Sequence, residues 1–233
     1  MKINQIVLPR AAKRLKAVYE KSVEIAQKDD IVVDVGADHG YLAAMFAKSE
    51  KFAKVIATDI SSPSLNKTVE LSQKLNLEIE TRVGDGLLVA QDATMACICG
   101  MGGYEIIKIL QQKNNVKKFV LMPAQNPIEL RQFLLENNYK IVKDYVLKDS
   151  GKFYYLFVID GFGKNKYSKF EKMFGKNKSL QESEFQDFVE NQINKLKFLE
   201  NFDINNVAED QKKIIKQKYE YYKICKKLKN KDV

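Results

Sequence analysis

One stretch constrains the fold more than any other: Ile31-Val32-Val33-Asp34-Val35-Gly36-Ala37-Asp38-His39-Gly40-Tyr41-Leu42. A run of mostly β-branched residues enters a turn with two glycines, and a helical pattern follows at once. This order predicts a buried parallel strand that brings a ligand to the start of a helix. The turn is spaced Gly-x-Asp-x-Gly, without the Gly-x-Gly-x-x-Gly of dinucleotide binders or a following Gly-Lys-Ser/Thr. The sequence therefore argues against a pyrophosphate cradle and favours a nucleoside cofactor without phosphates.

The same alternation of strand and helix patterns continues as far as residue 160. Strands are expected at 31–35, 53–60, 77–83, 93–99 and 116–122, with helices at 9–28, 41–48, 65–75, 104–110 and 128–136; 139–147 and 153–160 have the pattern of a terminal hairpin. This order predicts an α/β fold with a parallel sheet and helices on both faces. Open sheets of this kind bind ligands at the carboxyl ends of their strands, so the loops there are the candidate site.

Those loops carry residues suited to a nucleoside. Asp59 ends the second strand, where a carboxylate can accept hydrogen bonds from both hydroxyls of a ribose; the alternative is a cap for the helix beginning near Ser61. Gly84-Asp85-Gly86 places an acid at a tight turn, where it could accept from the exocyclic amine of an adenine. Three glycines within Gly100-Met101-Gly102-Gly103 indicate a sharp turn or a close ligand approach.

The formal charge of +9, from 39 basic and 30 acidic residues, permits a polyanionic partner such as RNA. Because arginine is scarce and lysine, asparagine and isoleucine are plentiful, a compositional bias accounts for the charge as well. Arg10 and Arg14, on the first predicted helix, are either solvated surface residues or contacts to a phosphate.

Cysteine content and hydropathy argue for an ordinary cytoplasmic protein. No apolar run reaches the ~18 residues of a membrane span, and the N-terminal residues lack the apolar core of a secretory signal. Cys97, Cys99 and Cys225 form no Cys-x-x-Cys pair, so neither a disulfide framework nor a metal site is expected.

After Gly161-Phe162-Gly163 the strand patterns cease. Apolar residues then recur at helical spacings, predicting a second domain, 163–233, of two antiparallel helices packed as a short coiled coil. One of these helices is defined by a strict seven-residue repeat at Val207, Ile214, Tyr221 and Leu228. From residue 164 onward there are 17 lysines, no arginine and 11 acidic residues. The domain is therefore either a solvated, self-packed helical hairpin or a lysine-rich arm that grips the RNA backbone.

With its acids and glycine turns, the region 1–162 resembles the Rossmann-like catalytic domain of class I S-adenosylmethionine-dependent methyltransferases. More specifically, the chain resembles the TrmK family, bacterial tRNA (adenine-N1)-methyltransferases that modify the adenosine at position 22 of the D-arm. The specific part is Asp38-His39-x-Tyr41-Leu42 joined to Gly100-Met101-Gly102-Gly103. Further matches are Arg14-Leu15, Asp34-x-Gly36, Asp59-Ile60, Arg82-x-Gly84-x-Gly86-Leu87, Pro123, Asn126, Arg131, Tyr155, Phe174-Gly175 and Leu180.

The motifs and the resemblance together imply S-adenosyl-L-methionine as cofactor, tRNA as partner and no metal, with a monomer favoured. The implied catalytic residues are Asp38, Tyr41 and Met101. The implied cofactor contacts are Asp34, Gly36, Asp38, His39, Asp59, Ile60, Gly84, Asp85, Gly86, Gly100, Met101 and Gly102. The implied substrate contacts are Arg10, Arg14, Tyr41, Gly103, Gln125 and Asn126.

Three positions depart from the family pattern: Met122 stands where glutamine is usual, Lys176 where proline is usual, and Gly40 where alanine is common. The glutamine would be a polar contact near the acceptor base, and Gln125 could replace it.

The enzyme is expected to act mainly by positioning the base against the methyl group. General acid–base catalysis is not needed, because the N1 lone pair of adenine is free at neutral pH. The base must leave its stack to be reached. Tyr41 or Met101 is expected to pack on it, and Asp38 or the Gly100 carbonyl to accept from its amino group. Since no proton has to be removed, His39 is expected to serve the turn rather than act as a base. Two alternatives remain open: a different methyl acceptor, or a non-catalytic RNA-binding protein with this fold.

Overall fold

The computed structural model describes residues 12–176 and 182–229. Contacts divide the chain into two compact units, Met1–Lys176 and Asn177–Val233. The sequence placed the division earlier, between residues 162 and 163. The intervening segment stays with the first unit because its helix α6 (Lys169–Phe174) docks there. The guanidinium of Arg131 donates hydrogen bonds to the carbonyls of Lys172 and Met173, and Phe174 is fully buried.

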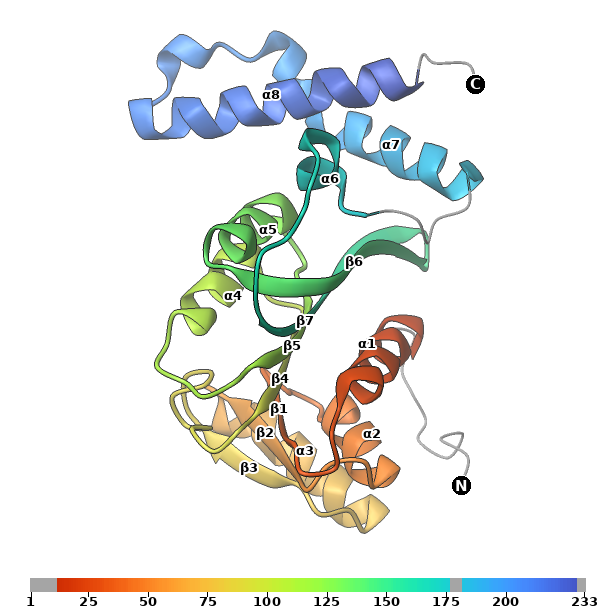
Figure 1. Cartoon of the computed structure of the whole chain (residues 1–233), viewed down its shortest axis with the longest axis vertical. Helices are drawn as coiled ribbons and strands as arrows, with labels where there is room; N and C mark the ends of the chain where they lie inside the picture. Colours follow the sequence, from red (N-terminus) through yellow and green to blue (C-terminus); the bar gives the residue numbers. More distant parts are fainter. Residues whose placement is uncertain (1–11, 177–181, 230–233) are drawn as a thin grey trace. The chain divides into compact units, whose positions relative to one another are not determined.

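The first unit is built on one seven-stranded sheet in the order β3-β2-β1-β4-β5-β7-β6 (Figure 1). The strands are β1 (Ile31–Val35), β2 (Lys54–Asp59), β3 (Glu80–Val83), β4 (Met95–Cys99), β5 (Lys118–Met122), β6 (Tyr139–Asp149) and β7 (Lys152–Phe162). β1 to β5 pair in parallel, and β7 is antiparallel to both β5 and β6. The predicted parallel sheet with a terminal hairpin is confirmed.

The register of the central strands sets the position of the loops. Val35 at the end of β1 pairs with Thr58 on β2 and with Ile98 on β4. The three strands therefore end level with one another, and the turns that follow them meet at one edge of the sheet. Because the first strand is central, it is also nearly fully buried, as its apolar sequence predicts.

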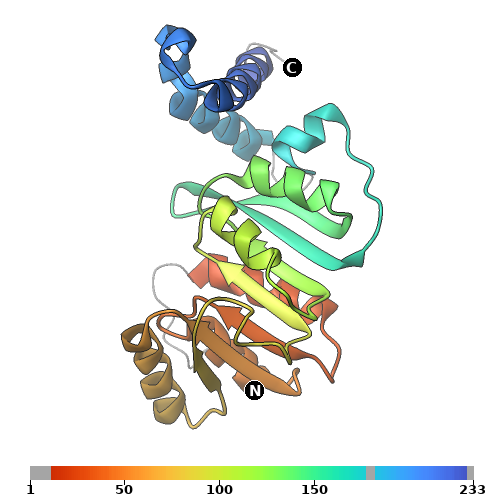
Figure 2. The same cartoon turned by 90° about the vertical axis from the view of Figure 1, so that its left-hand side faces the viewer.

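Helices cover both faces of this sheet (Figures 1 and 2). The helices on one face are α1 (Ala12–Ile25), α2 (Tyr41–Ser49) and α3 (Ser62–Leu75); those on the other are α4 (Gly103–Leu110) and α5 (Pro127–Glu136). The third strand begins at Glu80, later than the predicted residue 77. The reason is the end of α3: Asn76 adopts a left-handed conformation, and the Leu77 amide donates to the Ser72 carbonyl.

The second unit contains α7 (Glu182–Leu196), two short 3-10 segments, η2 (Lys197–Asn201) and η3 (Ile204–Asn206), and α8 (Glu209–Lys229). Lys229 pairs with Glu190, whereas Lys226 pairs with Glu200, so the partners run in opposite directions. The two helices thus run antiparallel, and their packing as a short coiled coil stays a prediction. Of the seven-residue repeat, Tyr221 is buried but Ile214 is 36% exposed, so the apolar packing of α8 is concentrated towards its C-terminal half.

Within the described residues, no helix combines the length and apolar character required to cross a bilayer.

Candidate functional site

The turn between β1 and α2 uses left-handed backbone at alternate positions. Gly36, Asp38 and Gly40 have φ angles of 73°, 44° and 67°. At Gly40 a Cβ atom would lie 2.5 Å from the Thr68 side chain, so glycine is required there by conformation and by space. Aspartate tolerates the left-handed region better than most residues, which explains how Asp38 occupies the middle position of the motif. The Gly-x-Asp-x-Gly spacing thus encodes this turn directly.

Asp34 lies at the end of β1 beneath this turn and is only 5% exposed. Its Oδ2 accepts a hydrogen bond of 3.2 Å from the Ala43 amide at the start of α2. Burial, reinforced by the negative charge of Asp59, raises the pKa of the Asp34 carboxyl to about 7. This carboxyl therefore titrates near neutral pH.

A cavity of about 470 Å³ opens at the carboxyl edge of the sheet. Its walls come from the turns after β1, β2, β3 and β4 and from one face of α4. The lining residues are Val35, Gly36, Thr58, Asp59, Ile60, Gly84, Asp85, Gly86, Cys99, Gly100, Met101, Glu105, Lys108, Ile109 and Gln112. We call it the larger cavity. Eight of the predicted cofactor contacts are brought together here.

Asp59 and Ile60 form the wall supplied by β2. The Asp59 carboxylate accepts from the Ser61 amide at 2.9 Å and, more weakly, from the Asp38 amide at 3.4 Å. The helix itself is capped by Ser61, whose hydroxyl accepts from Ser64, so capping is not the main task of Asp59. The Ile60 side chain is 77% exposed, which leaves an apolar surface in the cavity wall without a partner from the described chain.

Two polar side chains, Arg82 and Gln112, fix the loop that carries Asp85. Arg82 donates to the Val89 carbonyl at 3.0 Å and pairs with Asp92. From the opposite side, Gln112, just beyond the C-terminal end of α4, accepts from the Leu87 amide at 2.8 Å. The loop between β3 and β4 is therefore held at Leu87, Val89 and Asp92, while Asp85 stays exposed.

A second cavity of about 290 Å³ lies between α1 and the turn that follows β1. Its lining residues are Arg14, Leu15, Val18, Asp34, Gly36, Ala37, Asp38, His39, Tyr41, Leu42, Cys99, Gly100 and Met122. We call it the smaller cavity. It shares Gly36, Cys99 and Gly100 with the larger cavity. The two cavities therefore adjoin at the ends of β1 and β4.

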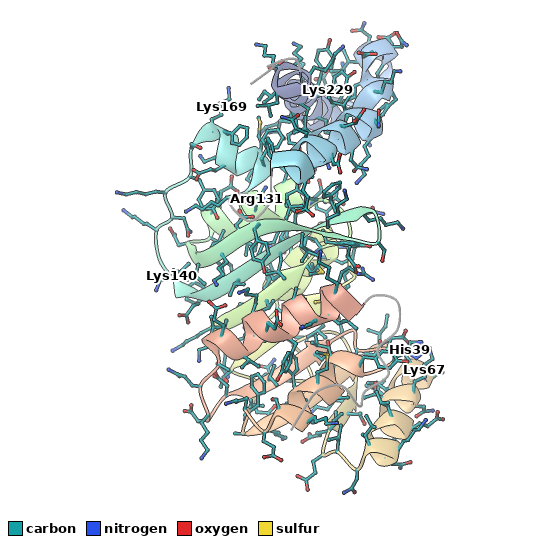
Figure 3. All side chains as sticks on the ribbon, turned by 90° about the vertical axis from the view of Figure 1, so that its right-hand side faces the viewer. His39, Lys67, Arg131, Lys140, Lys169 and Lys229 are labelled. Carbon is teal, nitrogen blue, oxygen red and sulfur yellow. The ribbon has the colours of Figure 1, made fainter. Side chains whose placement is uncertain are left out.

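Aromatic and charged side chains form the rim of the smaller cavity. The His39 and Tyr41 rings stack with centroids 5.7 Å apart. Asp38 Oδ1 is 2.7 Å from Lys67 Nζ on α3, and this ion pair holds the pKa of Asp38 below its usual value. Figure 3 shows His39 and Lys67 close together at this end of the molecule. Arg14 lies with its guanidinium 4.4 Å from the Tyr154 ring centre.

Four predicted contacts line neither cavity: Gly102, Gly103, Gln125 and Asn126. They join the turns after β4 and β5 instead. The Gly103 amide donates to the Gln125 carbonyl at 2.8 Å, and a Cβ on Gly103 would lie 2.3 Å from the Asn126 carbonyl oxygen. Close backbone packing thus accounts for the glycine at position 103. Arg10 lies outside the described residues.

Sequence reasoning missed the contribution of α4. Glu105, Lys108, Ile109 and Gln112 all line the larger cavity. The spacing of Glu105, Lys108 and Ile109 places these three on one face of α4, directly after the glycine turn, and Gln112 follows just beyond the end of the helix. This helical spacing could be read from the sequence, but the prediction assigned ligand contacts only to the glycine turn before the helix. Met122, which stands where glutamine is usual in the family, is buried and lines the smaller cavity.

A family model described as a methyltransferase domain matches residues 11–157. The chain belongs to this methyltransferase family. Among curated relatives, a Mycoplasma pneumoniae protein named "Putative tRNA methyltransferase" is 35% identical over 134 residues, covering 56% of this chain and 63% of the relative. The Bacillus subtilis tRNA (adenine(22)-N(1))-methyltransferase is 30% identical over 154 residues, with 62% and 63% covered. The chain thus spans less than two thirds of the length of these relatives.

A solved structure of a Streptococcus pneumoniae protein in complex with S-adenosyl-L-methionine matches with a TM-score of 0.72 and 25% identity. The match covers 91% of this chain and 98% of that one. These comparisons confirm the resemblance to the TrmK family and the Rossmann-like methyltransferase fold that the motifs predicted.

Proposed function

We propose that the protein transfers a methyl group from S-adenosyl-L-methionine to N1 of the adenine at position 22 in the D-arm of tRNA. The observation that carries this proposal is the pair of adjoining cavities. The larger one has room for a nucleoside cofactor and the smaller one for a single base, and they share the backbone at Gly36 and Gly100. The names of the relatives in Mycoplasma pneumoniae and Bacillus subtilis supply the tRNA and the position.

The larger cavity fits this cofactor better than a dinucleotide. Its walls carry three carboxylates, from Asp59, Asp85 and Glu105, against one ammonium, from Lys108. A pyrophosphate would be repelled by that excess of negative charge, whereas a cationic sulfonium nucleoside is attracted. The exposed Ile60 offers an apolar surface for the adenine ring, next to the carboxylate that would hold the ribose.

When bound, S-adenosyl-L-methionine supplies a methyl group on positively charged sulfur. The N1 lone pair of adenine forms the new C–N bond as the C–S bond breaks, and the bonding electron pair stays with sulfur. No proton moves, and the base gains a positive charge. The chain's own part is to hold the base in line through the smaller cavity, with Tyr41 as the stacking surface and Met101, which lines the larger cavity, beside the reacting atoms.

Asp59→Ala should weaken cofactor binding by about 10- to 100-fold, because two charge-assisted hydrogen bonds to the ribose are lost. Calorimetric titration with S-adenosyl-L-methionine measures the change. Ser61→Ala is the matched control, since it removes the cap of α3 and leaves the carboxylate in place. It should lower stability by about 1 kcal/mol without changing cofactor affinity. Equal weakening by both variants would refute the ribose contact.

The second unit is proposed to serve as a lysine-rich arm that contacts tRNA, with α7 and α8 packed in coiled-coil fashion. Exposed lysines along α8 include Lys213, Lys216 and Lys227. Their charges are available for the phosphate backbone, which dominates the affinity of most nucleic-acid complexes. A tRNA substrate also implies a cytoplasmic location, and one copy of the site suffices for the reaction, so a monomer is proposed.

Replacing Lys213, Lys216 and Lys227 together by glutamine should lower tRNA affinity about tenfold and flatten its dependence on salt. Cofactor affinity should not change. The control replaces Lys28, Lys51 and Lys117, which are exposed just before β1, β2 and β5, at the opposite edge of the sheet from the cavities. Both sets remove the same charge. If filter binding shows the same loss for the two sets, the arm has no special role.

The function itself is tested by incubating the full chain with S-adenosyl-L-methionine and unmodified bulk tRNA. Digestion and mass spectrometry should then find N1-methyladenosine. A different methylated nucleoside would point to another acceptor. Failure of the protein to bind the cofactor in calorimetry would favour a non-catalytic RNA-binding protein.

A further inference from the structure

One buried side-chain oxygen in the wall of the larger cavity has no hydrogen-bond partner. Thr58, near the end of β2, is 0% exposed, and its Oγ1 bonds to no other described residue. Its carbonyl accepts from the amides of Gly36 and Ala37 at 2.8 and 3.1 Å, so the backbone here is fixed to the turn after β1. A buried hydroxyl without a partner is uncommon, because it has lost its hydration and gained no bond in return.

The neighbouring strands explain why the sheet supplies no partner for this hydroxyl. Thr58 pairs in register with Val35 on β1 and with Arg82 on β3, so these side chains flank it on the same face of the sheet. Val35 has no polar side-chain atom, and the guanidinium of Arg82 donates to two carboxylates and a backbone carbonyl instead. Valine has the branched shape of threonine without its hydroxyl, so packing alone does not account for threonine at this position.

The larger cavity offers the hydroxyl a partner of another kind. Thr58 lines this cavity together with Asp59, Ile60 and Asp85, and it does not line the smaller one. Those three neighbours are the residues expected to meet the ribose and the adenine. We infer that the Thr58 hydroxyl forms a hydrogen bond with the adenosyl part of S-adenosyl-L-methionine and so acts as a positioning residue. This inference rests on the cofactor of the proposed function and adds a residue that the sequence motifs did not include.

The burial of Thr58 gives this hydrogen bond an unusual effect on affinity. An exposed hydroxyl has to release water before it can bind a ligand, and that loss cancels much of the gain. Thr58 Oγ1 is already shielded from solvent by the protein, and rotation about χ1 can turn it towards a ligand in the cavity without moving the backbone. The hydroxyl should therefore lower the stability of the protein without cofactor and raise its affinity for the cofactor.

Thr58→Val tests both effects, because it keeps the branched side chain and removes the hydroxyl. Calorimetric titration should show S-adenosyl-L-methionine binding about tenfold more weakly. 5′-Methylthioadenosine keeps the adenosyl part and lacks the amino-acid part, and in competition titrations it should lose affinity by the same factor. Without ligand, the variant should unfold at the same or a higher temperature than the unmodified protein. Thr58→Ser retains a hydroxyl and should keep cofactor affinity within about threefold.

Thr94→Val is the matched control, because the Thr94 hydroxyl is bonded within the protein. It donates to Asp30 Oδ1 at 2.8 Å and accepts from the Ile31 amide at 3.0 Å. Thr94 lies just before β4, at the opposite edge of the sheet from the cavities. Its substitution should lower the unfolding temperature by about 2–4 °C and leave cofactor affinity unchanged.

Three results would overturn the assignment of Thr58. The first is unchanged cofactor affinity in Thr58→Val, and the second is a loss for S-adenosyl-L-methionine that 5′-methylthioadenosine does not share. The third is a lower unfolding temperature of Thr58→Val without ligand, because the hydroxyl would then be bonded within the protein. If the unmodified protein does not bind S-adenosyl-L-methionine at all, the proposed function fails instead.

Discussion

Arg131→Met lowers the free energy of unfolding by about 3–5 kcal/mol, since it leaves the buried Asp144 carboxylate without its charged partner and with only the Tyr167 hydroxyl as a donor. Arg131 is fully buried; its Nε is 2.6 Å from Asp144 Oδ2 and its Nη2 is 2.9 Å from Oδ1. Figure 3 shows Arg131 inside the first unit, whereas Lys140 and Lys169 project outward. The other arm of the guanidinium holds the end of α6. Urea denaturation followed by circular dichroism measures the loss.

Two further variants make this expectation specific. Arg82→Met removes an arginine that pairs with Asp92 near the surface, and it should cost about 1 kcal/mol or less. Arg131→Met combined with Asp144→Leu removes both buried charges and should recover much of the lost stability. A loss below about 1 kcal/mol for Arg131→Met alone, or no recovery in the double variant, would contradict a buried and paired arginine.

Gly100→Ala reduces kcat/KM for methyl transfer by about 100-fold, although the side chain it adds meets no protein atom. Gly100 has a φ of 83°, and a Cβ built there has nothing within 4 Å. The residue lines both cavities, so the new methyl group occupies the space where cofactor and base would meet. Steady-state assays with tRNA, together with calorimetric titration of the cofactor, measure the effect.

Gly151→Ala is its matched control. Gly151 has a φ of 75° and equally open surroundings, but it lies in the turn between β6 and β7. Both substitutions strain the backbone by about 1–2 kcal/mol, so their effects on stability should be similar. Only Gly100→Ala should reduce activity. If both variants keep full activity, Gly100 does not border the reacting groups.

Much of the fold followed from local patterns. The β-branched run before Gly36, the end of β2 at Asp59 and the turn at Gly84 to Gly86 were each placed by residues adjacent in sequence. Parallel pairing then brings the loops to one edge without further information, because consecutive strands of this type point the same way. The four loops that border the larger cavity could therefore be brought together from the sequence, whereas the fifth predicted loop, after β5, lines neither cavity.

What could not be predicted depends on contacts between residues distant in sequence. Asp34 and Asp59 look alike as acids at strand ends, yet only the structure shows that Asp34 faces the smaller cavity. Likewise, the arginine that fixes α6 pairs with a strand residue and with carbonyls about forty positions away, so the domain division was placed too early. The glycine at position 103 was taken for a ligand contact because a tight backbone approach has the same sequence requirement.

The most direct test of the central claim maps the methyl group on a defined tRNA. A transcript with adenosine at position 22, and the same transcript with guanosine there, are incubated with the protein and S-adenosyl-L-methionine. A methyl on N1 blocks base pairing, so reverse transcription should stop next to position 22 on the first transcript and read through on the second. Methylation at any other position, or read-through on both transcripts by protein that binds the cofactor, would contradict the account.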